Sequence, residues 1–560
     1  MSEKPLLIMP EDIQRLMGKD AQRNNILAAK MVADVVKTTL GPKGMDKMIV
    51  SSTGDIIITN DGVTILNEMQ IENPAAKMMV EIAKTQEDEA GDGTTTAVMT
   101  AGKLLENAET LLDQRIHPTV ITKGYSLAQE KAQEILKEIS LKITDQDEEI
   151  LKQIAMTAMT GKGAEGFKEK FSEIVVKAVK QIKDSSQNIN INDIKIVKSK
   201  GQGIKDTKLI SGIVINKEKA SSEMPSKIEN PKIALIDFGL EIKNPEIDTK
   251  ISINSPEQLQ NFISQEEDSI KKMVEKIKES GANVVFCQKG IDEFANYLLS
   301  KSGIYACRRV PKSDMEKIAK ASNARIINNL NEMDSTILGS ARTLEESKNK
   351  ENQNLTFITG CENPKAVTIL INGGTEHVID EIERAIKDSI GDVASSLKEN
   401  LIVPGGGAIE IELARQLRHY GQSLSGREQY AVEQYALALE SIPAALAENA
   451  GLDPIDILTE LKSKHDSGEK HTGLNLFNNK VENMLHAKIL EPYKTKSQAL
   501  SSATEVATMI LRIDDVINSQ RTSGSSGGGY GPGMTGMSGG SGRNRNSGGG
   551  FPQGMQGMGF

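Results

Sequence analysis

Apolar residues recur at the three-and-four spacing of amphipathic helices near both ends of the chain. The first such segment, residues 13–40, predicts a helix that stops at the breaker cluster of residues 41–44. A second helix is predicted from Val98, and the pattern is helical again beyond residue 405. Both ends of the chain are therefore expected to be mainly α-helical. The in-phase apolar residues are Ile26, Leu27, Met31, Val35, Val36 and Leu40 in the first helix, and Val98, Ala101, Leu104, Leu105, Ala108, Leu111 and Leu112 in the second.

Two short β-rich runs follow the first helix. They lie in DKMIVSSTGDIIITNDGVTIL, residues 46–66, and are joined by the turn signal Thr53-Gly54-Asp55. This pattern predicts a β-hairpin. The hairpin ends at Asn60-Asp61-Gly62, and a second short helix is expected after it.

Between residues 231 and 371, short apolar runs alternate with helical segments. This alternation predicts a partly parallel sheet and a self-contained α/β domain. Its long helix has Ser255 as N-cap, Pro256 at the first helical position and Gln258 at the capping-box position, and runs to Gly281. A middle α/β domain between two helical flanks suggests that the N- and C-terminal parts form one domain together.

The composition is that of a globular protein with several domains. A chain of 560 residues, 38% hydrophobic and 26% charged, exceeds what one hydrophobic core organises, so two to four domains are expected. A net charge of −10 and only 3% aromatic residues, without Trp, weigh against a nucleic-acid partner. No run approaches the roughly 20 apolar residues of a membrane span, and the apolar patch at the start is too short for a signal sequence.

The cysteines and histidines indicate neither a disulfide framework nor a metal site. Cys287, Cys307 and Cys361 are widely spaced without a C-x-x-C pair, and the six histidines show no metal-binding spacing. These residues predict reduced thiols in a cytoplasmic protein.

The last segment, residues 523–560, has a different character. Gly accounts for 16 of its 38 residues, without the strict period of three that collagen requires. No hydrophobic core can form from this composition, so a flexible Gly/Met-rich tail is expected.

The turn Gly91-Asp92-Gly93-Thr94-Thr95-Thr96 carries the first candidate chemistry. It combines unobstructed backbone N–H groups, three hydroxyls and the positive end of a helix dipole, which suits a phosphate. The Asp92 carboxylate would repel phosphate oxygens unless a divalent cation lay between them, and Mg²⁺ prefers such a ligand set. A magnesium nucleotide is one interpretation of this turn. A Thr-rich N-cap after a glycine turn is the other, and this segment alone leaves both open.

Nine collinear motifs resemble a group II chaperonin, the archaeal thermosome and eukaryotic cytosolic chaperonin family. The resemblance extends from about residue 5 to 520, and its general style is nearer to the archaeal thermosome. The motifs are TTLGPKGMDKMIV, NDGVTIL, AGDGTTTAV, TGKGAE, GANVVFCQKGID, RRVPKSDMEKIAKA, VPGGGAIEIELA, ALAENAGLDPIDIL and SATEVATMILRIDDVI.

This resemblance implies a multidomain fold with discontinuous, nested domains. A mainly α-helical equatorial ATPase domain would comprise residues 1–146 and 405–522, and a small α/β intermediate hinge domain residues 147–214 and 370–404. The α/β apical domain, residues 215–369, would bind substrate and carry a helical protrusion that serves as a built-in lid.

The resemblance also implies an ATP-dependent chaperone with ATP and Mg²⁺ as cofactors. Its subunits would assemble with identical or sister subunits into two stacked rings that close over an unfolded polypeptide. Neither a nucleic acid nor a membrane is expected as a partner.

The family's nucleotide-site residues carry over onto matching positions. Gly91, Asp92, Gly93, Thr94, Thr95 and Thr96 would wrap the phosphates, with Asp92 on Mg²⁺, and Gly41 and Pro42 would form a second phosphate-contacting turn. Lys162 would sense the γ-phosphate. For the purine and ribose the matching residues are Gly405, Gly406, Gly407, Gly473, Asn475 and Glu491. Each glycine segment has a purely structural alternative, as a helix stop or a turn.

Two acids are implied in hydrolysis. Asp388 matches the family's catalytic aspartate, and Asp61 would lie near the metal and the attacking water. The alternatives are a solvated charged helix face for Asp388 and a plain Asn-Asp-Gly turn for Asp61. The chain departs from the family at Lys387 and Ser389, where His and Ala are usual, but both changes leave the Asp388 carboxylate in place.

The substrate-facing residues are implied by the apical domain. The protrusion, between Glu241 and Gln265, offers Ile251, Leu259, Phe262 and Ile263, and the next helix offers Phe294 and Tyr297. A stripe of this kind is more often part of a hydrophobic core than a binding surface.

Two rival functions fit the sequence less well than an ATP-driven folding machine. A P-loop phosphotransferase would carry G-x-x-x-x-G-K-[ST], which the chain lacks. A non-hydrolysing scaffold subunit would be free to lose Asp61, Asp92 and Asp388, which are all present.

Overall fold

The structure is a computed structural model that describes residues 13–50, 54, 56–184, 188–201, 203–242, 255–348, 353–362 and 364–519. Residues 16–516 form one compact unit, and the two chain ends, up to Arg15 and from Ile517, belong to a second. The predicted Gly/Met-rich tail lies outside the described residues.

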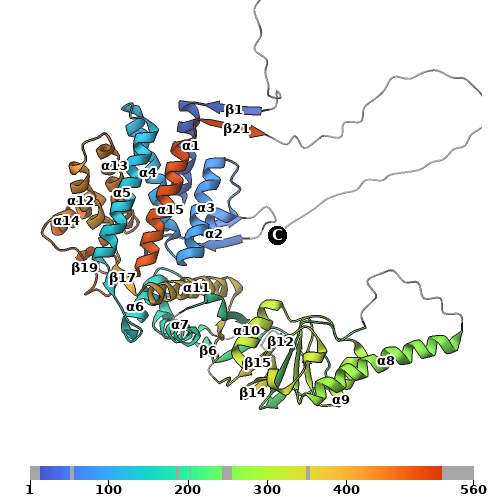
Figure 1. The fold of residues 1–560 in the computed structure, drawn as a ribbon. Helices are drawn as coiled ribbons and strands as arrows, with labels where there is room; N and C mark the ends of the chain where they lie inside the picture. The colour runs from blue at the N-terminus through green and yellow to red at the C-terminus, as the bar shows by residue number, and fades with distance from the viewer. Residues whose placement is uncertain are drawn as a thin grey trace, which may run out of the picture. The chain divides into compact units, whose positions relative to one another are not determined.

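The helices of the N- and C-terminal parts share one hydrophobic core (Figure 1). Ile26, Leu105 and Tyr125 from the first part pack in the same cluster as Tyr435 and Leu500 from the last. The two ends of the chain therefore fold together, whereas the exact domain boundaries remain a prediction. The helices of this core are α1 (Lys19–Lys37), α2 (Gly62–Glu68), α3 (Pro74–Ala90), α4 (Thr94–Asp113), α5 (Pro118–Ile139), α12 (Ala408–Ser423), α13 (Glu428–Asn449) and α15 (Tyr493–Leu511).

The predicted helix over residues 13–40 is wrong at its start. Residues 13–17 form strand β1 (Ile13–Met17), which pairs with β21 (Asp515–Ser519), and α1 begins only at Lys19. Gly18 breaks the helix because its φ is +63°, and its N–H donates to the carbonyl of Asp514 at 2.6 Å. The helix ends at Lys37, shortly before the predicted breaker cluster.

The predicted hairpin and the short helix after it are confirmed. Strands β2 (Lys47–Val50) and β3 (Ile56–Thr59) pair in antiparallel register, Lys47 opposite Thr59. Helix α2 then starts with Asp61 as its N-cap.

A second hydrophobic core is built by two separate chain segments. Leu151 and Phe171 from the first segment pack with Ile369 and Ile386 from the second. In its sheet, β16 pairs with β5 in parallel and with β6 in antiparallel register. The elements of this core are α6 (Glu148–Met159), α7 (Lys168–Ile182), β5 (Ile194–Lys200), β6 (Lys208–Ile210), β16 (Val367–Gly373) and α11 (Glu376–Glu399). β4 (Leu141–Lys142), β17 (Leu401–Pro404) and β20 (Leu490–Pro492) form a small sheet, in which β17 is the central strand.

The middle of the chain is α/β, and its partly parallel sheet is confirmed. Four strands lie parallel in the order β11-β10-β9-β12, and β13 adds to β9 in antiparallel register. All four residues of β10 are buried, as expected for a strand covered on both faces. The elements are β9 (Lys232–Ile236), β10 (Val284–Cys287), β11 (Tyr305–Cys307), β12 (Ile326–Ile327), β13 (Gly339–Ser340), α8 (Pro256–Glu279), α9 (Glu293–Lys301) and α10 (Lys312–Ser322). A second sheet has the order β7-β15-β14-β8, with bounds Gly212–Ile215, Asn354–Thr359, Thr343–Lys348 and Lys227–Glu229.

The predicted ends of the long helix α8 are confirmed. The Ser255 side chain accepts a hydrogen bond from the Gln258 N–H at 3.3 Å, and Pro256 is the first helical residue. Gly281 follows the end of the helix with a φ of +84°, a conformation that favours glycine.

The three cysteines are free and buried, in agreement with the predicted reduced thiols. Within the part of the chain that the structure describes, no helix is long and apolar enough to cross a membrane.

Helices α3 and α11 meet through two glycines. A Cβ built on Gly391 would lie 2.8 Å from the Cα of Gly91, closer than carbon atoms pack without a shift of the backbone. Because both backbones would have to move, we expect Gly391→Val to lower the free energy of unfolding by about 2 kcal/mol. Urea denaturation followed by circular dichroism measures this. Gly374→Val is the matched control, since a Cβ there meets nothing within 4 Å. Equal midpoints for the two variants would contradict the prediction.

Candidate functional site

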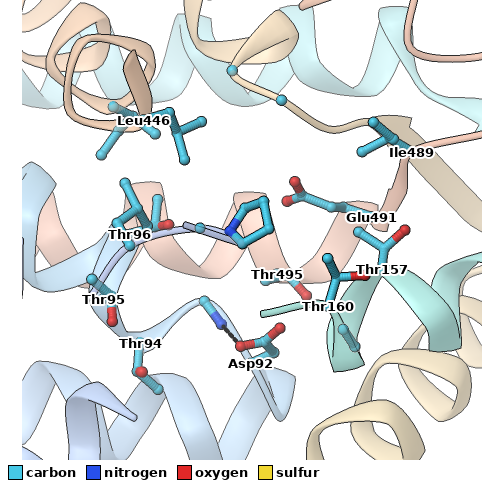
Figure 2. Close-up of a pocket in the computed structure, with 18 of the residues that line it drawn as sticks. Asp92, Thr94, Thr95, Thr96, Thr157, Thr160, Leu446, Ile489, Glu491 and Thr495 are labelled. Carbon is cyan, nitrogen blue, oxygen red and sulfur yellow. Dashed lines mark hydrogen bonds between the residues drawn. The ribbon is translucent and has the colours of Figure 1, made fainter. Parts of the chain in front are cut away.

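A cavity of about 220 Å³ is lined by residues on elements of both hydrophobic cores (Figure 2). The first core contributes α4 and α15, and the second contributes the end of α6 and the turn after it. Most of the residues predicted for a nucleotide line this cavity: Gly41, Pro42, Asp61, Asp92, Gly93, Thr94, Thr95, Thr96, Lys162, Gly406, Gly407 and Glu491.

The predicted phosphate turn is a tight loop that ends in a helix N-terminus. Gly91 and Gly93 both have φ of +82°, and α4 begins at Thr94, so its first N–H groups have no intrahelical acceptor. The Gln86 side chain fixes the loop, since its Nε2 donates to the carbonyls of Asp92 at 2.8 Å and Thr495 at 3.0 Å. Such a helix N-terminus attracts anions.

The Asp92 side chain remains available to a ligand. Its Oδ1 accepts the Gly93 N–H at 2.7 Å, drawn as a dashed line in Figure 2, and the side chain is 34% exposed. Within the residues that the structure describes, no three His, Cys, Asp or Glu side chains converge to hold a metal ion. A Mg²⁺ ion at Asp92 would therefore complete its shell with phosphate oxygens and water, the ligand set that Mg²⁺ prefers. The donor chemistry fits a metal that arrives with a nucleotide.

Lys162 and Asp388 form an ion pair next to this loop. Lys162 Nζ lies 2.5 Å from Asp388 Oδ2 and 4.0 Å from Asp92 Oδ1. Asp388 does not line the cavity itself, but Lys162 does. Burial, together with the charges of Asp92 and Asp61, raises the pKa of Asp388 to about 7, although Lys162 opposes the shift. Burial lowers the pKa of Lys162, but the charges of Asp388 and Asp92 outweigh it and the net shift is upward.

Asp61 is both an N-cap and a cavity residue. Its Oδ2 accepts hydrogen bonds from the Thr64 N–H at 2.9 Å and the Thr64 hydroxyl at 2.6 Å. The neighbouring Asn60 Nδ2 donates to the carbonyl of Gly161 at 2.9 Å, which ties this turn to the loop that carries Lys162. The turn alternative is therefore realised, and the same carboxylate still faces the cavity.

The alternative of a solvated charged face for α11 does not hold in full. Arg384 Nη1 donates to the Thr59 hydroxyl at 2.8 Å and to Glu381 at 2.7 Å, and both charged side chains are less than a third exposed. This side of α11 is packed against β3.

Several residues predicted for the purine and ribose support the wall without lining it. A Cβ on Gly473 would lie 2.9 Å from the carbonyl of Gly405, so these glycines allow two backbones to approach closely. The Asn475 side chain is occupied by Glu482 at 2.6 Å and by the Phe477 N–H at 2.9 Å. Gly405, Gly473 and Asn475 are absent from the cavity lining.

Sequence reasoning did not identify part of the lining. The apolar side chains make a wall suited to a purine, and the polar ones lie beside the phosphate loop and at Glu491. Asp392 follows Asp388 by one helical turn, and Thr157 and Thr160 precede the Lys162 motif, so spacing could have indicated them. The overlooked residues include Thr157, Thr160, Asp392, Ile442, Leu446, Leu476, Ile489, Thr495 and Lys496.

Strand β18 (Thr472–Asn475) forms part of the cavity wall and is supported by a buried pair, His465 and Glu412. His465, at the end of α14 (Pro454–Asp466), lies with Nδ1 2.9 Å from Glu412 and Nε2 2.8 Å from the carbonyl of Thr472. The His465 ring thus links α14 to α12 and to β18. Burial would raise the pKa of Glu412, but hydrogen bonds from His465, Arg415 and Gln416 outweigh it and hold that pKa at about 2.

The predicted substrate-facing residues lie in different surroundings. On α8, Phe262 is 37% and Ile263 46% exposed, and on α9 Tyr297 is 53% exposed. Phe294 instead packs against the core of the α/β region. Ile251 and the side chain of Leu259 lie outside the described residues.

Comparison with known proteins identifies the class to which this fold and cavity belong. The TCP-1/cpn60 chaperonin family matches residues 32–521. A thermosome subunit of Methanopyrus kandleri is 55% identical over 523 residues, 93% of this chain and 96% of the relative. The thermosome subunit beta of Archaeoglobus fulgidus is 54% identical over 537 residues, 95% of this chain and 98% of the relative. The thermosome subunit alpha of Thermoplasma acidophilum is 53% identical over 536 residues, with shares of 95% and 98%.

The chain therefore belongs to the TCP-1/cpn60 chaperonin family. Within that family, the likeness to thermosome subunits over nearly the whole length makes it a group II chaperonin subunit. The resemblance seen in the sequence motifs is thereby confirmed.

Proposed function

We propose that this chaperonin subunit binds MgATP in the cavity and hydrolyses it to drive the folding of unfolded polypeptides. One observation carries the proposal: Lys162, paired with Asp388 at 2.5 Å, lies 4.0 Å from Asp92 at the helix N-terminus suited to phosphate. A cation that lines the cavity thus lies between an acid just outside it and the predicted phosphate loop. This is the set that phosphoryl transfer to water requires.

Each residue of the site would have a separate role in hydrolysis. The N-terminus of α4 and the Thr94, Thr95 and Thr96 hydroxyls bind the phosphates, and Asp92 holds the Mg²⁺ ion, which neutralises charge on the phosphates when bound. Asp388 accepts the proton of the attacking water, and Asp61 orients that water. Lys162, which pairs with Asp388 and lines the cavity, would sense the γ-phosphate.

Hydrolysis would respond to movement of one core against the other. Asp388 and Lys162 belong to α11 and to the turn after α6, in the second core, whereas Asp92 and α4 belong to the first. The two halves of the site would separate if the cores moved apart, so hydrolysis would depend on closure. We assign the first core to the equatorial domain, the second to the intermediate domain and the α/β region to the apical domain.

The apical domain would bind clients and close the chamber with a built-in lid. Phe262, Ile263 and Tyr297 are the exposed apolar and aromatic residues proposed to contact an unfolded chain. Subunits would form a double ring with identical or sister subunits; in Archaeoglobus fulgidus the relatives are named alpha and beta.

ATPase activity with and without unfolded protein tests the proposal, together with the mass of the assembly. We expect phosphate release that an unfolded client stimulates, and a particle of about 970 kDa, 16 subunits of 60.7 kDa. Stimulation by a small molecule alone would favour a phosphotransferase. Nucleotide binding without phosphate release, with any client, would favour a scaffold subunit.

The pH dependence of kcat/KM follows from the raised pKa of Asp388. The base must be ionised, and its pKa in the free protein is about 7. We therefore expect kcat/KM to be level above pH 7 and to fall about tenfold per pH unit below it, since kcat/KM reports the free enzyme. Initial rates between pH 5.5 and 8.5, at constant ionic strength, measure the profile. A profile level down to pH 5.5 would contradict the assignment.

A further inference from the structure

At the wall of the cavity, three charged side chains from three elements form a largely buried cluster. Lys496 Nζ, in the first turn of α15, lies 2.7 Å from Glu491 Oε2 on β20 and 2.8 Å from Glu410 Oε1 in the first turn of α12. The side chains of Lys496 and Glu410 are only 9% and 6% exposed. Glu491 and Lys496 line the cavity, whereas Glu410 does not.

The cluster contains one positive charge for two carboxylates. Glu410 Oε2 is buried and has no hydrogen-bond partner, an arrangement that costs free energy unless Lys496 compensates the charge. Burial lowers the pKa of Lys496, but the two carboxylates outweigh it and the net shift is upward. Without Lys496, two carboxylates would face each other in a buried place, and one of them would be protonated.

Lys496 occupies only one oxygen of Glu491. The other oxygen, Oε1, lies beside Gly405, where a Cβ would approach it to 2.6 Å. Figure 2 shows the Glu491 side chain extending into the space between the labelled residues of the cavity. Burial raises the pKa of Glu491, and Lys496 opposes this shift and favours the carboxylate. A carboxylate with one oxygen held by Lys496 has its other oxygen available as an acceptor for hydroxyl groups.

We propose that Lys496, anchored by Glu410, is a positioning residue that keeps Glu491 ionised and directed at the ribose hydroxyls of the nucleotide. The inference rests on the proposed nucleotide function, in which the family resemblance already implies a ribose contact for Glu491, and adds the positioning role of Lys496 and Glu410 to it. Among the described residues, the ion pairs of Lys496 are to Glu410 and Glu491 and not to Asp388, so we expect the cluster to act on binding and not on the chemical step.

The first test compares ATP with 2′,3′-dideoxy-ATP. For the wild type we expect a KM about 10- to 100-fold lower for ATP, the range of a hydrogen bond to a charged group. Lys496→Met should raise the KM for ATP by about that factor and remove the discrimination, with kcat within threefold of the wild type. The matched control is Lys494→Met. Lys494 lies two residues before Lys496 on the same helix, and its ion pair is with Glu89, at 3.8 Å.

A double-variant cycle separates positioning from a structural role. If Lys496 acts through Glu491, Lys496→Met combined with Glu491→Gln should have the same KM as Glu491→Gln alone. The buried cluster of the double variant has the same net charge as that of the wild type. The double variant therefore remains informative if Lys496→Met alone fails to fold. A KM in the double variant equal to the product of the two single effects would overturn the proposal.

Direct binding distinguishes the failure of each proposal. Calorimetry of the wild type with MgADP should show binding; a wild type that binds no nucleotide would overturn both the proposed function and this inference. A wild type that binds MgATP and MgATP lacking both hydroxyls equally well would overturn the inference alone.

Discussion

Asp388→Asn is expected to lower kcat for ATP hydrolysis by at least 100-fold while leaving nucleotide affinity nearly unchanged. A general base contributes about 10²- to 10⁴-fold to a rate, and the amide cannot accept the proton of the attacking water. Asp388 does not line the cavity, so its loss removes no direct contact to a bound nucleotide. Phosphate release in steady state measures kcat, and calorimetry with MgADP measures affinity.

Asp380→Asn provides the matched control for this experiment. Asp380 lies on the same helix, α11, but pairs at 2.8 Å with Lys198, which is half exposed. This variant should keep the kcat of the wild type. If Asp388→Asn retained more than a third of the activity, or lost nucleotide binding together with activity, Asp388 would not be the base.

Asp92→Asn is expected to weaken MgATP binding by at least 30-fold. The variant loses the carboxylate that holds the metal between protein and phosphates. Without Mg²⁺ the sign reverses, since the wild-type carboxylate then only repels the phosphates at the α4 N-terminus. In the presence of a chelator, the Asp92→Asn variant should therefore bind free ATP as tightly as the wild type does, or more tightly.

Titration of the Asp92→Asn variant with ATP, with and without Mg²⁺, measures both predicted affinities. Asp88→Asn is the control, because Asp88 is an exposed acid on α3 that does not line the cavity. An equal loss of affinity with and without the metal would mean that Asp92 shapes the loop, through its bond to the Gly93 N–H, and holds no metal.

Local patterns predicted the elements whose partners are near in sequence. The β2–β3 hairpin follows from its turn residues, and α8 follows from Ser255, Pro256 and Gly281. The parallel sheet follows from alternating strands and helices. The strand at residues 13–17 was missed because its partner, residues 515–519, lies some 500 residues away and five residues carry too little periodicity to decide.

The residues of the site also differ in whether local sequence could predict them. The phosphate turn could be inferred from its own residues, because a glycine turn before a helix suffices. The contact between Lys162 and Asp388 depends on chain packing over 226 residues, and only the family resemblance pointed to both. Lys496 carried no local signal at all, since its meaning comes from Glu410 and Glu491 on two other elements.

The shared core of the two chain ends has a consequence for synthesis. Glu491, Thr495 and Lys496 complete the cavity, and they are among the last described residues to leave the ribosome. A nascent chain of 480 residues already contains the phosphate loop, Lys162 and Asp388, yet lacks β20 and α15. Although α1, α3 and α4 can pack against one another, the faces of α4 and α5 that contact α15 stay uncovered until α15 is translated. Until that helix docks, the nascent subunit exposes apolar surface of the kind that chaperones bind.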